Sequence, residues 1–132
     1  MNTTKVKDLM TRNLIAIEGE ESVIDASKTM IENKIGSVLV YENEIPIGII
    51  TERDIVQKLM TDCKDLCEVK AIEIASKQLI TISPTDTIEH ALVIMHRNRI
   101  KRIPVKDPNT NELVGIITTH DIIAAFNTLE LV

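Results

Sequence analysis

The sequence predicts an α+β fold made of two copies of one β-α-β-β-α unit. The run Leu-Ile-Ala-Ile at residues 14–17 returns as Leu-Ile-Thr-Ile at 79–82, and Gly-Ile-Ile-Thr at 48–51 returns at 115–118. The matches keep one order with a single two-residue insertion, which is the pattern of an internal duplication. One three-stranded sheet with two helices buries too little surface alone. We therefore expect a sandwich-like α/β arrangement, with two repeats packed sheet to sheet in pseudo-two-fold symmetry.

The first half of each copy predicts a strand and then an amphipathic helix. Residues 14–17 and 79–82 are short apolar runs that favour strands. Ser22 and Thr87 follow as hydroxyl residues of the kind that cap helix starts. Apolar side chains then recur at helical spacing and predict a buried face. These are Val23, Ala26 and Met30 in the first copy and Ile88, Ala91, Leu92 and Met95 in the second.

The second half of each copy predicts a β-hairpin and a closing helix. The β-rich runs are residues 37–41 and 47–51, then 102–106 and 114–118. Turn-forming residues at 42–46 and 107–111 separate the paired runs, and the second turn carries the insertion. The closing helices have their own apolar residues. These are Ile55, Val56, Leu59 and Met60 in the first helix and Ile122, Ile123 and Phe126 in the second.

The duplication sets the expected domain boundaries. The first repeat is residues 5–61 and the second is residues 76–128, with 62–75 as the linker and lead-in to the second repeat. Val69, Ile72 and Ile74 give this connection apolar anchors. A repeat near 65 residues is longer than a solenoid unit, which favours a closed pair over an open array.

Composition favours a soluble, cytoplasmic globular protein. Of the 132 residues, 44% are hydrophobic and 27% are charged, with a net charge of −5. No run approaches the ~18 apolar residues of a membrane span, and the first residues have no signal-peptide core. The acidic balance disfavours general nucleic-acid binding. Cys63 and Cys67 lie four apart, but no further Cys or close His pair completes a zinc site, so we expect no metal.

No catalytic motif is present, so the sequence predicts a protein that is not an enzyme. It contains no Gly-x-Ser-x-Gly elbow, no P-loop, no Gly-x-Gly-x-x-Gly and no His-Glu-x-x-His. No pair of carboxylates is accompanied by an evident nucleophile.

The most informative motif is Thr-x-x-Asp at the start of each closing helix, where Thr51 precedes Asp54 and Thr118 precedes Asp121. One interpretation is structural, because this spacing forms a capping box. The other is functional: a helix N-terminus attracts phosphate, and a carboxylate there accepts hydrogen bonds from ribose hydroxyls. Gly48 and Gly115 would then let the backbone approach a ligand closely. Both interpretations remain open from the residues alone.

The motifs together resemble tandem cystathionine-beta-synthase (CBS) repeats, the arrangement called a Bateman module. The resemblance rests on Asp-Leu-Met-Thr at 8–11, on the glycine-to-aspartate segments 48–54 and 115–121, and on Lys-Arg-Ile-Pro-Val at 101–105. It covers residues 5 to 127 and implies a stand-alone sensor whose clefts bind AMP, ADP or ATP, with S-adenosylmethionine also possible. The resemblance also implies that the protein requires no cofactor, that it forms a homodimer and that it regulates a separate protein.

The resemblance also assigns the ligand-binding residues, each cleft taking its helix start from one repeat and its adenine pocket from the other. One cleft combines Thr118, His120 and Asp121 with Thr11, Asn13, Ile15 and Ser37. The second cleft combines Thr51, Arg53 and Asp54 with Ser76, Gln78, Ile80 and Arg102. Lys101, Arg102 and Pro104 belong to the fuller motif of the second copy, which the first copy lacks, so the two clefts need not be equivalent.

Two further functions remain open. The repeats would serve as a dimerisation or protein-interaction module if the clefts are vestigial. The basic run at 96–102 would alternatively make the chain a nucleic-acid adaptor, although one Tyr, one Phe and no Trp offer little surface for base stacking. The same basic residues also suit the solvated end of a helix or a nucleotide phosphate.

Overall fold

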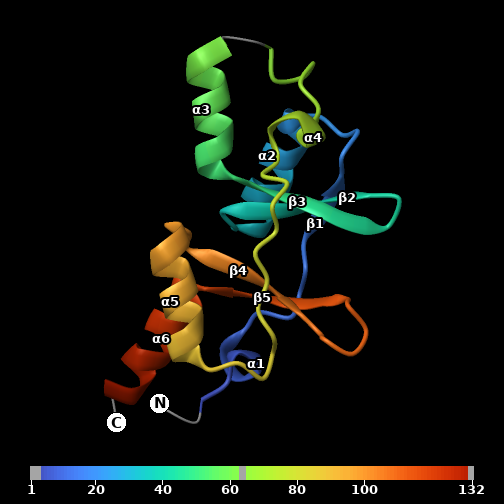
Figure 1. Cartoon of the computed structure of the whole chain (residues 1–132). Helices are drawn as coiled ribbons and strands as arrows, with labels where there is room; N and C mark the ends of the chain where they lie inside the picture. Colours follow the sequence, from blue (N-terminus) through green and yellow to red (C-terminus); the bar gives the residue numbers. More distant parts are fainter. Residues whose placement is uncertain (1–3, 63–64, 131–132) are drawn as a thin grey trace. The chain divides into compact units, whose positions relative to one another are not determined.

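The computed structural model describes residues 4–62 and 65–130, and it has the expected mixed α/β fold with two sheets (Figure 1). The elements are α1 (Val6–Leu9), β1 (Ala16–Glu18), α2 (Val23–Asn33), β2 (Ser37–Glu42), β3 (Ile45–Thr51), α3 (Glu52–Asp62), α4 (Ala71–Ile74), α5 (Ile88–Asn98), β4 (Arg102–Lys106), β5 (Leu113–Thr118) and α6 (Thr119–Glu130). They form two compact units. Unit 1 takes in the chain as far as Leu14 and again from Ile80 onward, and unit 2 is Ile15–Leu79.

Unit 2 contains a three-stranded sheet in the order β1-β2-β3. β1 pairs with β2 in parallel, and β2 pairs with β3 in the antiparallel sense. The core lies between this sheet and the helices, because alternate strand residues such as Val38, Val40 and Ile50 are fully covered. Ala26 and Met30 from α2 complete it, as the helical spacing predicted.

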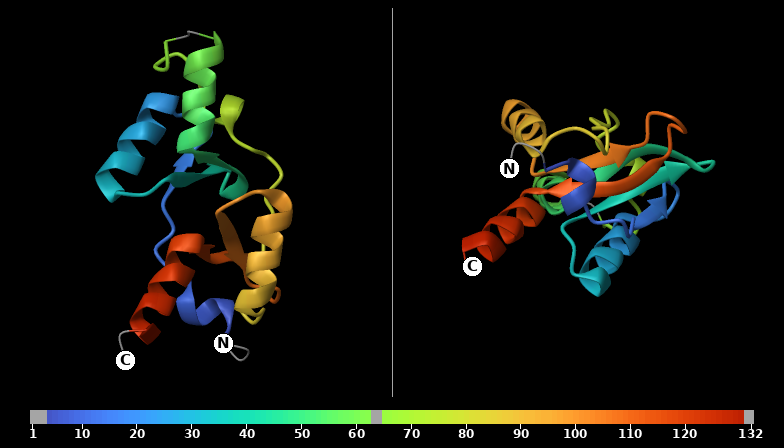
Figure 2. Two further views of the ribbon diagram at one scale, coloured as in Figure 1. Left: turned by 90° about the vertical axis from the view of Figure 1, so that its left-hand side faces the viewer. Right: turned by 90° about the horizontal axis from the view of Figure 1, so that it is seen from below.

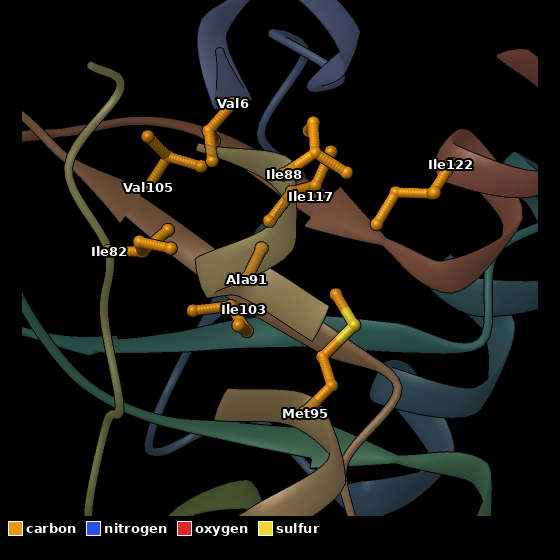
Figure 3. Close-up of a cluster of buried hydrophobic side chains, with 9 residues drawn as sticks. All are labelled: Val6, Ile82, Ile88, Ala91, Met95, Ile103, Val105, Ile117 and Ile122. Atoms are coloured by element: carbon orange, nitrogen blue, oxygen red, sulfur yellow. The ribbon is translucent and has the colours of Figure 1, made fainter. Parts of the chain in front are cut away.

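Unit 1 repeats this plan with a two-stranded sheet, β4-β5. Its core joins Ile103 and Val105 from β4, Ile117 from β5 and Ile122 from α6 (Figure 3). The predicted strand at residues 79–82 is reduced to one parallel bridge, Ile82 to Val105.

Two prolines explain the missing strand. In unit 2 the edge strand is held by hydrogen bonds from Leu39 N–H to the Ile15 carbonyl and from Gly19 N–H to the Tyr41 carbonyl. The residues at the positions of Leu39 and Gly19 in the second copy are Pro104 and Pro84. Proline has no N–H to donate, so both flanking bonds are lost. The bonds that remain join Ile82 N–H to the Pro104 carbonyl and Lys106 N–H to the Ile82 carbonyl.

The helices α2 and α5 begin at the predicted hydroxyl residues. The Ser22 hydroxyl accepts the N–H of Asp25 at 3.1 Å, and the Thr87 hydroxyl accepts the N–H of His90 at 3.1 Å. The predicted core faces are buried with one exception. Leu92 is 39% exposed, so its assignment to the buried face of α5 was wrong.

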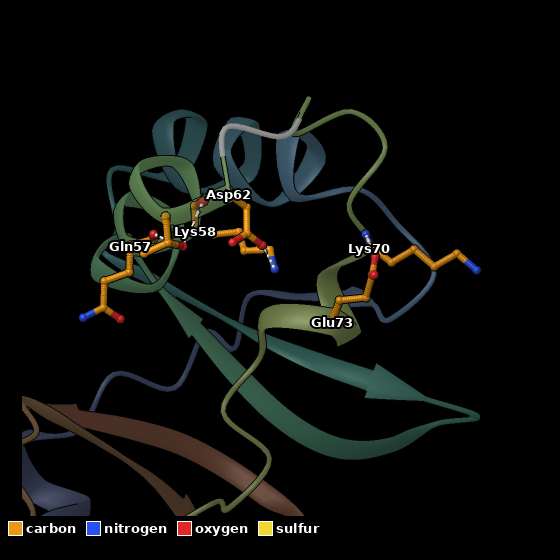
Figure 4. A network of polar contacts seen from close by, with 6 residues as sticks. Gln57, Lys58, Asp62, Lys70 and Glu73 are labelled. Atoms are coloured by element: carbon orange, nitrogen blue, oxygen red, sulfur yellow. Dashed lines mark hydrogen bonds and ion pairs between the residues drawn. The ribbon is translucent and has the colours of Figure 1, made fainter.

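A short helix precedes the first predicted strand of each copy, and the sequence did not predict either helix. We call residues 4–11 the first lead-in and residues 69–76 the second lead-in. In the first, the N–H of Lys5 donates to Asp8 at 2.9 Å. In the second, the N–H of Lys70 donates to Glu73 at 2.6 Å (Figure 4). In each helix, the third residue is therefore acidic, and its carboxylate accepts the backbone N–H of the residue that precedes the helix.

Each lead-in packs in the unit that holds the other repeat. The N–H of Val6 in the first lead-in donates to the Asp86 carbonyl at 2.8 Å, and Val6 is fully buried in the core of unit 1. The helix α1 accordingly lies beside α6 (Figures 1 and 2). The N–H of Ala71 in the second lead-in donates to the Glu21 carbonyl at 2.7 Å, and Ala71 is fully buried in unit 2. Val69, predicted as an anchor, is buried there as well.

The ends of the lead-ins extend the hairpin sheets. Thr11 exchanges two backbone hydrogen bonds of 2.9 Å with Ile116 of β5. Ser76 exchanges bonds of 3.1 and 2.9 Å with Ile49 of β3. The edge strand of each hairpin is thus covered by a segment from far away in the chain, which removes an exposed row of unpaired backbone groups.

This close pairing explains the glycine in each hairpin. A Cβ atom added at Gly48 would lie 2.6 Å from the Ser76 carbonyl oxygen, and one added at Gly115 would lie 2.8 Å from the Thr11 carbonyl oxygen. Neither glycine has a positive φ, so space rather than backbone conformation excludes a side chain. The backbone that approaches these glycines is that of the lead-in, whereas the sequence had suggested a ligand there.

The closing helices leave much of their apolar surface uncovered. On α3, Val56, Leu59 and Met60 are 51%, 48% and 76% exposed. On α6, Ile122 is buried, whereas Ile123 and Phe126 are 55% and 42% exposed. Across the ranges that the structure describes, no helix is long and apolar enough to span a bilayer.

We expect Gly48→Ala and Gly115→Ala each to lower the free energy of unfolding by about 1–3 kcal/mol, because the new methyl group meets fixed backbone. Gly19→Ala should cost less, since its Cβ would lie 3.2 Å from the Ile72 side chain rather than from a carbonyl. Urea unfolding of the three variants measures the difference. Equal midpoints for wild type and Gly48→Ala would contradict the tight fit.

Candidate functional site

The start of α3 holds the first Thr-x-x-Asp motif in a closed hydrogen-bonded form. Thr51 is the last residue of β3, and its backbone N–H donates to Oδ2 of Asp54 at 2.8 Å. The Thr51 hydroxyl donates to the same Oδ2 at 3.0 Å and accepts the N–H of Asp54 at 3.3 Å. This is the capping box that the spacing allowed. Within unit 2, the described hydrogen bonds leave Oδ1 of Asp54 unused.

The start of α6 holds the second motif in a different form. The N–H of Thr118 donates to Oδ2 of Asp121 at 3.0 Å, and the Thr118 hydroxyl accepts the N–H of Asp121 at 3.0 Å. The second carboxylate oxygen, Oδ1, accepts the hydroxyl of Thr11 at 3.3 Å, although the two residues are 110 positions apart. The first lead-in therefore contributes directly to the polar groups at this helix start.

At both helix starts, two of the first three backbone N–H groups already donate hydrogen bonds within the protein. The first amide of α3, from Glu52, donates to the Gly36 carbonyl at 3.1 Å, and that of α6, from Thr119, donates to the Lys101 carbonyl at 2.9 Å. The third amide in each helix is bound by the threonine hydroxyl. In the described part of the chain, the second amide, at Arg53 and His120, keeps no such partner and is the group that remains for an anion.

The other predicted residues of unit 1 differ in position and exposure. Arg102 begins β4 directly opposite Thr118 in the sheet register. Cross-strand partners project on the same face, so these side chains are neighbours. Lys101 and His120 are exposed, Asn13 is exposed beside the first lead-in, and Ile80 is half-buried. Pro104 is buried, and its carbonyl accepts the N–H of Ile82.

Unit 2 holds the remaining predicted residues. Ser37 begins β2 directly opposite Thr51. Arg53 is exposed in the first turn of α3, and Gln78 is exposed beyond the second lead-in. Ser76 is exposed, with its backbone paired to β3. Ile15 is half-buried, and its carbonyl accepts the N–H of Leu39.

The structure therefore brings together part of each predicted group. Thr11 and Asn13 share unit 1 with residues 118–121, and Ser76 and Gln78 share unit 2 with residues 51–54. Ile15 and Ser37 belong to unit 2, whereas Ile80 and Arg102 belong to unit 1. Within its own unit Arg102 lies opposite Thr118, although the resemblance grouped it with Thr51.

A cavity that the sequence analysis missed lies in unit 2, between α2 and α3. It has a volume of about 520 Å³, and its walls include Met30, Ile31, Ile35 and Val56. Ile31 is 76% exposed in spite of its apolar side chain. In the sequence, the corresponding signal is an apolar residue beside Met30 that falls outside the spacing of the buried face. Gly36 and Glu52 line the same cavity, so it adjoins the start of α3.

Within the described part of the connection between the repeats, the thiol of Cys67 has an environment that disfavours reactivity. Cys67 is exposed, and the Asp65 carboxylate beside it raises the pKa of the thiol, which lowers its thiolate fraction at neutral pH. Cys63 lies outside the residues that the structure describes. Among the described residues, no group of three or more His, Cys, Asp or Glu side chains is arranged to hold a metal ion.

Comparison with known proteins gives the family. Residues 6–61 and 69–128 each match the CBS domain family. The uncharacterized protein MK0525 of Methanopyrus kandleri is 36% identical over 124 residues. That match covers 93% of this chain but only 63% of MK0525.

Solved structures agree in fold. An uncharacterized conserved protein from Pyrococcus horikoshii has a TM-score of 0.87 at 26% identity, with 95% of this chain and 93% of that chain covered. The CBS domain pair of protein MJ0100, solved with 5-methylthioadenosine and S-adenosyl-L-methionine, has a TM-score of 0.84 at 28% identity, covering 96% and 98%. CBS pairs are regulatory, ligand-binding modules. Two successive family matches and the duplicated fold show that this chain belongs to the CBS domain family, as a tandem pair.

Proposed function

We propose that the chain is a sensor that binds an adenine nucleotide and acts on a separate partner protein without catalysing a reaction. The observation that carries the proposal is the Thr–Asp pair at the starts of α3 and α6, which recurs at equivalent positions of the two units. Each pair combines a carboxylate, a hydroxyl and one remaining helix amide. These are the groups that a ribose and a phosphate require.

Each group has a distinct role in the proposed sites. Asp54 and Asp121 accept hydrogen bonds from the ribose hydroxyls, and the amides of Arg53 and His120 face the phosphate. The backbone near Ile15 and Ile80 reads the adenine edge, while apolar side chains cover the ring, which is the composition of a small-ligand pocket. The remaining proposed ligand contacts are Thr11, Asn13, Ser37, Ser76, Gln78, Lys101, Arg102 and Pro104.

The related pair of MJ0100 supports this ligand class, because both of its bound molecules carry an adenosine group. AMP, ADP, ATP and S-adenosylmethionine are accordingly the candidates to test. A cytoplasmic location fits these ligands and is part of the proposal.

The exposed apolar residues of α3 favour a second role, as a protein-interaction module that forms a homodimer. Val56, Leu59 and Met60 lie at helical positions i, i+3 and i+4, so they share one face. An apolar face of this kind is a usual mark of an interaction surface. This role is compatible with ligand sensing and is the alternative if no ligand binds.

We expect a thermal shift when an adenine nucleotide is added. At a ligand concentration near 100 times the dissociation constant, binding stabilises the folded protein by about 2.7 kcal/mol, which raises the melting temperature by roughly 10 °C. Melts with AMP, ATP and S-adenosylmethionine measure the effect, and GTP tests selectivity for the base. No shift with any of them would leave only the interaction module.

Asp121→Ala should weaken nucleotide binding by about 1–3 kcal/mol, because hydrogen bonds to a charged group are lost. It should also lower stability by about 0.5–2 kcal/mol, because the capping box is broken. Asp25→Ala is the matched control, since Asp25 closes an equivalent box with Ser22 at the start of α2. Calorimetry should show weaker binding only for Asp121→Ala. Equal affinities in a folded Asp121→Ala protein would contradict the ribose assignment.

Val56→Glu should shift the protein from dimer to monomer, because it places a charge on the exposed apolar face of α3. Gln57→Glu is the control, because it adds the same charge at the adjacent exposed position of the helix. Light scattering after size-exclusion chromatography gives the mass of each variant. A monomeric wild-type protein would contradict the homodimer.

A further inference from the structure

The cavity between α2 and α3 is walled by one face of each helix. Its lining residues recur at helical spacing, so those of one helix share a face. They are Met30, Ile31 and Lys34 from α2 and its C-terminal cap, and Glu52, Ile55 and Val56 from α3. The volume of about 520 Å³ is in the range of small-ligand sites. All of these residues belong to unit 2, so the cavity is complete within one unit.

Two opposite charges lie at the same end of this cavity. Lys34 caps the C-terminus of α2, and Glu52 is the first residue of α3. The backbone N–H of Glu52 donates to the Gly36 carbonyl at 3.1 Å, and Gly36 is only two residues beyond Lys34. Two residues span at most about 7 Å of chain. The side chains of Lys34 and Glu52 therefore start close together, where α2 ends and α3 begins.

Neither charge is paired inside the protein. In the part of the chain that the structure describes, the Lys34 ammonium and the Glu52 carboxylate have no ion pair and no hydrogen bond. Ser27 also lines the cavity, but its hydroxyl already donates to the Val23 carbonyl at 2.9 Å. Each charge lies at the helix end that suits its sign, so the fold tolerates it without a partner. One cation and one anion thus remain for a ligand.

The other walls of the cavity are aliphatic. Ile31 and Val56 are 76% and 51% exposed, Ile35 and Ile55 are half-buried, and Met30 adds a thioether. The described lining residues include no aromatic side chain. Covering such exposed apolar surface is favourable, and a methionine wall adapts to the shape of what covers it. The walls fit a branched or unbranched aliphatic group better than a flat ring.

We propose that this cavity binds a free α-amino acid with an aliphatic or thioether side chain, such as leucine or methionine. Lys34 pairs with the carboxylate of the ligand, and Glu52 pairs with its ammonium group. The ligand side chain lies against Ile31 and Val56. A free amino acid carries both charges on one carbon, whereas a residue within a peptide carries neither and a chain end carries one. The site is separate from the groups proposed to bind a nucleotide.

Titrations followed by amide NMR signals test the ligand class and its position together. Leucine should shift the amide signals of the residues that line the cavity. It should bind about tenfold more tightly than glycine, which has no side chain to cover the aliphatic walls. N-acetyl-leucine lacks the ammonium charge, and leucinamide lacks the carboxylate. Each should bind about three- to fivefold more weakly than leucine, because ion pairs of exposed groups contribute modestly.

Two variants assign the charges one at a time. Lys34→Gln should weaken leucine binding by about three- to fivefold but leave leucinamide binding unchanged, because leucinamide has no carboxylate to lose a partner. Glu52→Gln should weaken leucine binding by a similar factor and leave N-acetyl-leucine binding unchanged. A merely structural role would weaken both ligands equally. Arg99→Gln is the matched control, since Arg99 caps α5 with φ 53° as Lys34 caps α2 with φ 55°, and it does not line the cavity.

The outcomes separate this inference from the proposed nucleotide sensor. If AMP or ATP binds and no amino acid does, the inference fails and the sensor stands. If leucine binds with the expected pattern and no nucleotide binds, the reverse holds. A second copy that fills the cavity would also overturn the inference: leucine would not bind, and the amide signals of the lining residues would shift on dilution. Leucine, leucinamide and N-acetyl-leucine binding with equal affinity would refute the charge assignment.

Discussion

The pairing of each lead-in with the edge of a hairpin is the contact on which the rest of the structure depends. It consists of the two backbone bonds between Thr11 and Ile116 and the two between Ser76 and Ile49. These bonds cover the exposed edge of each sheet, carry Val6 and Ala71 into the cores, and require glycine at positions 48 and 115. They also bring the Thr11 hydroxyl to Asp121. One set of main-chain contacts thus builds the core and equips the site.

The duplicated plan fixes where the polar groups lie, and the differences between the copies decide what each group can do. Proline at 84 and 104 removes the hydrogen bonds that would complete a third strand in unit 1, while the register between the hairpin strands stays intact. That register sets Arg102 beside Thr118 and Ser37 beside Thr51. Symmetric backbone with asymmetric side chains allows two sites to share a scaffold and differ in chemistry.

The sequence predicted the features that recur along the chain. It did not predict features that depend on a single residue or on a partner far away in the sequence. The helices α2 and α5, with their hydroxyl caps, followed from periodicity and spacing. The helices α1 and α4 were missed because four residues complete little more than one turn, which is too short for a periodic signal. Comparing the two copies further upstream, Lys5 and Asp8 against Lys70 and Glu73, would have revealed them.

Leu92 was assigned to the core because helical spacing alone does not define the edge of a buried face. At the site, spacing found the Thr–Asp pairs, but only the coordinates show that the Thr51 hydroxyl donates to Asp54 and that the Thr11 hydroxyl donates to Asp121.

The division of the chain into units determines the order in which the units can fold during synthesis. Unit 2 is one uninterrupted stretch, so all of its parts have been synthesised once Leu79 has emerged. Unit 1 needs both the first residues of the chain and nearly the last, and its Thr11–Asp121 contact closes a loop of 110 positions. Closing so long a loop costs more conformational entropy than any local contact in unit 2. During synthesis the N-terminal segment therefore waits without its partner strand, and the half that bears the basic residues is completed last.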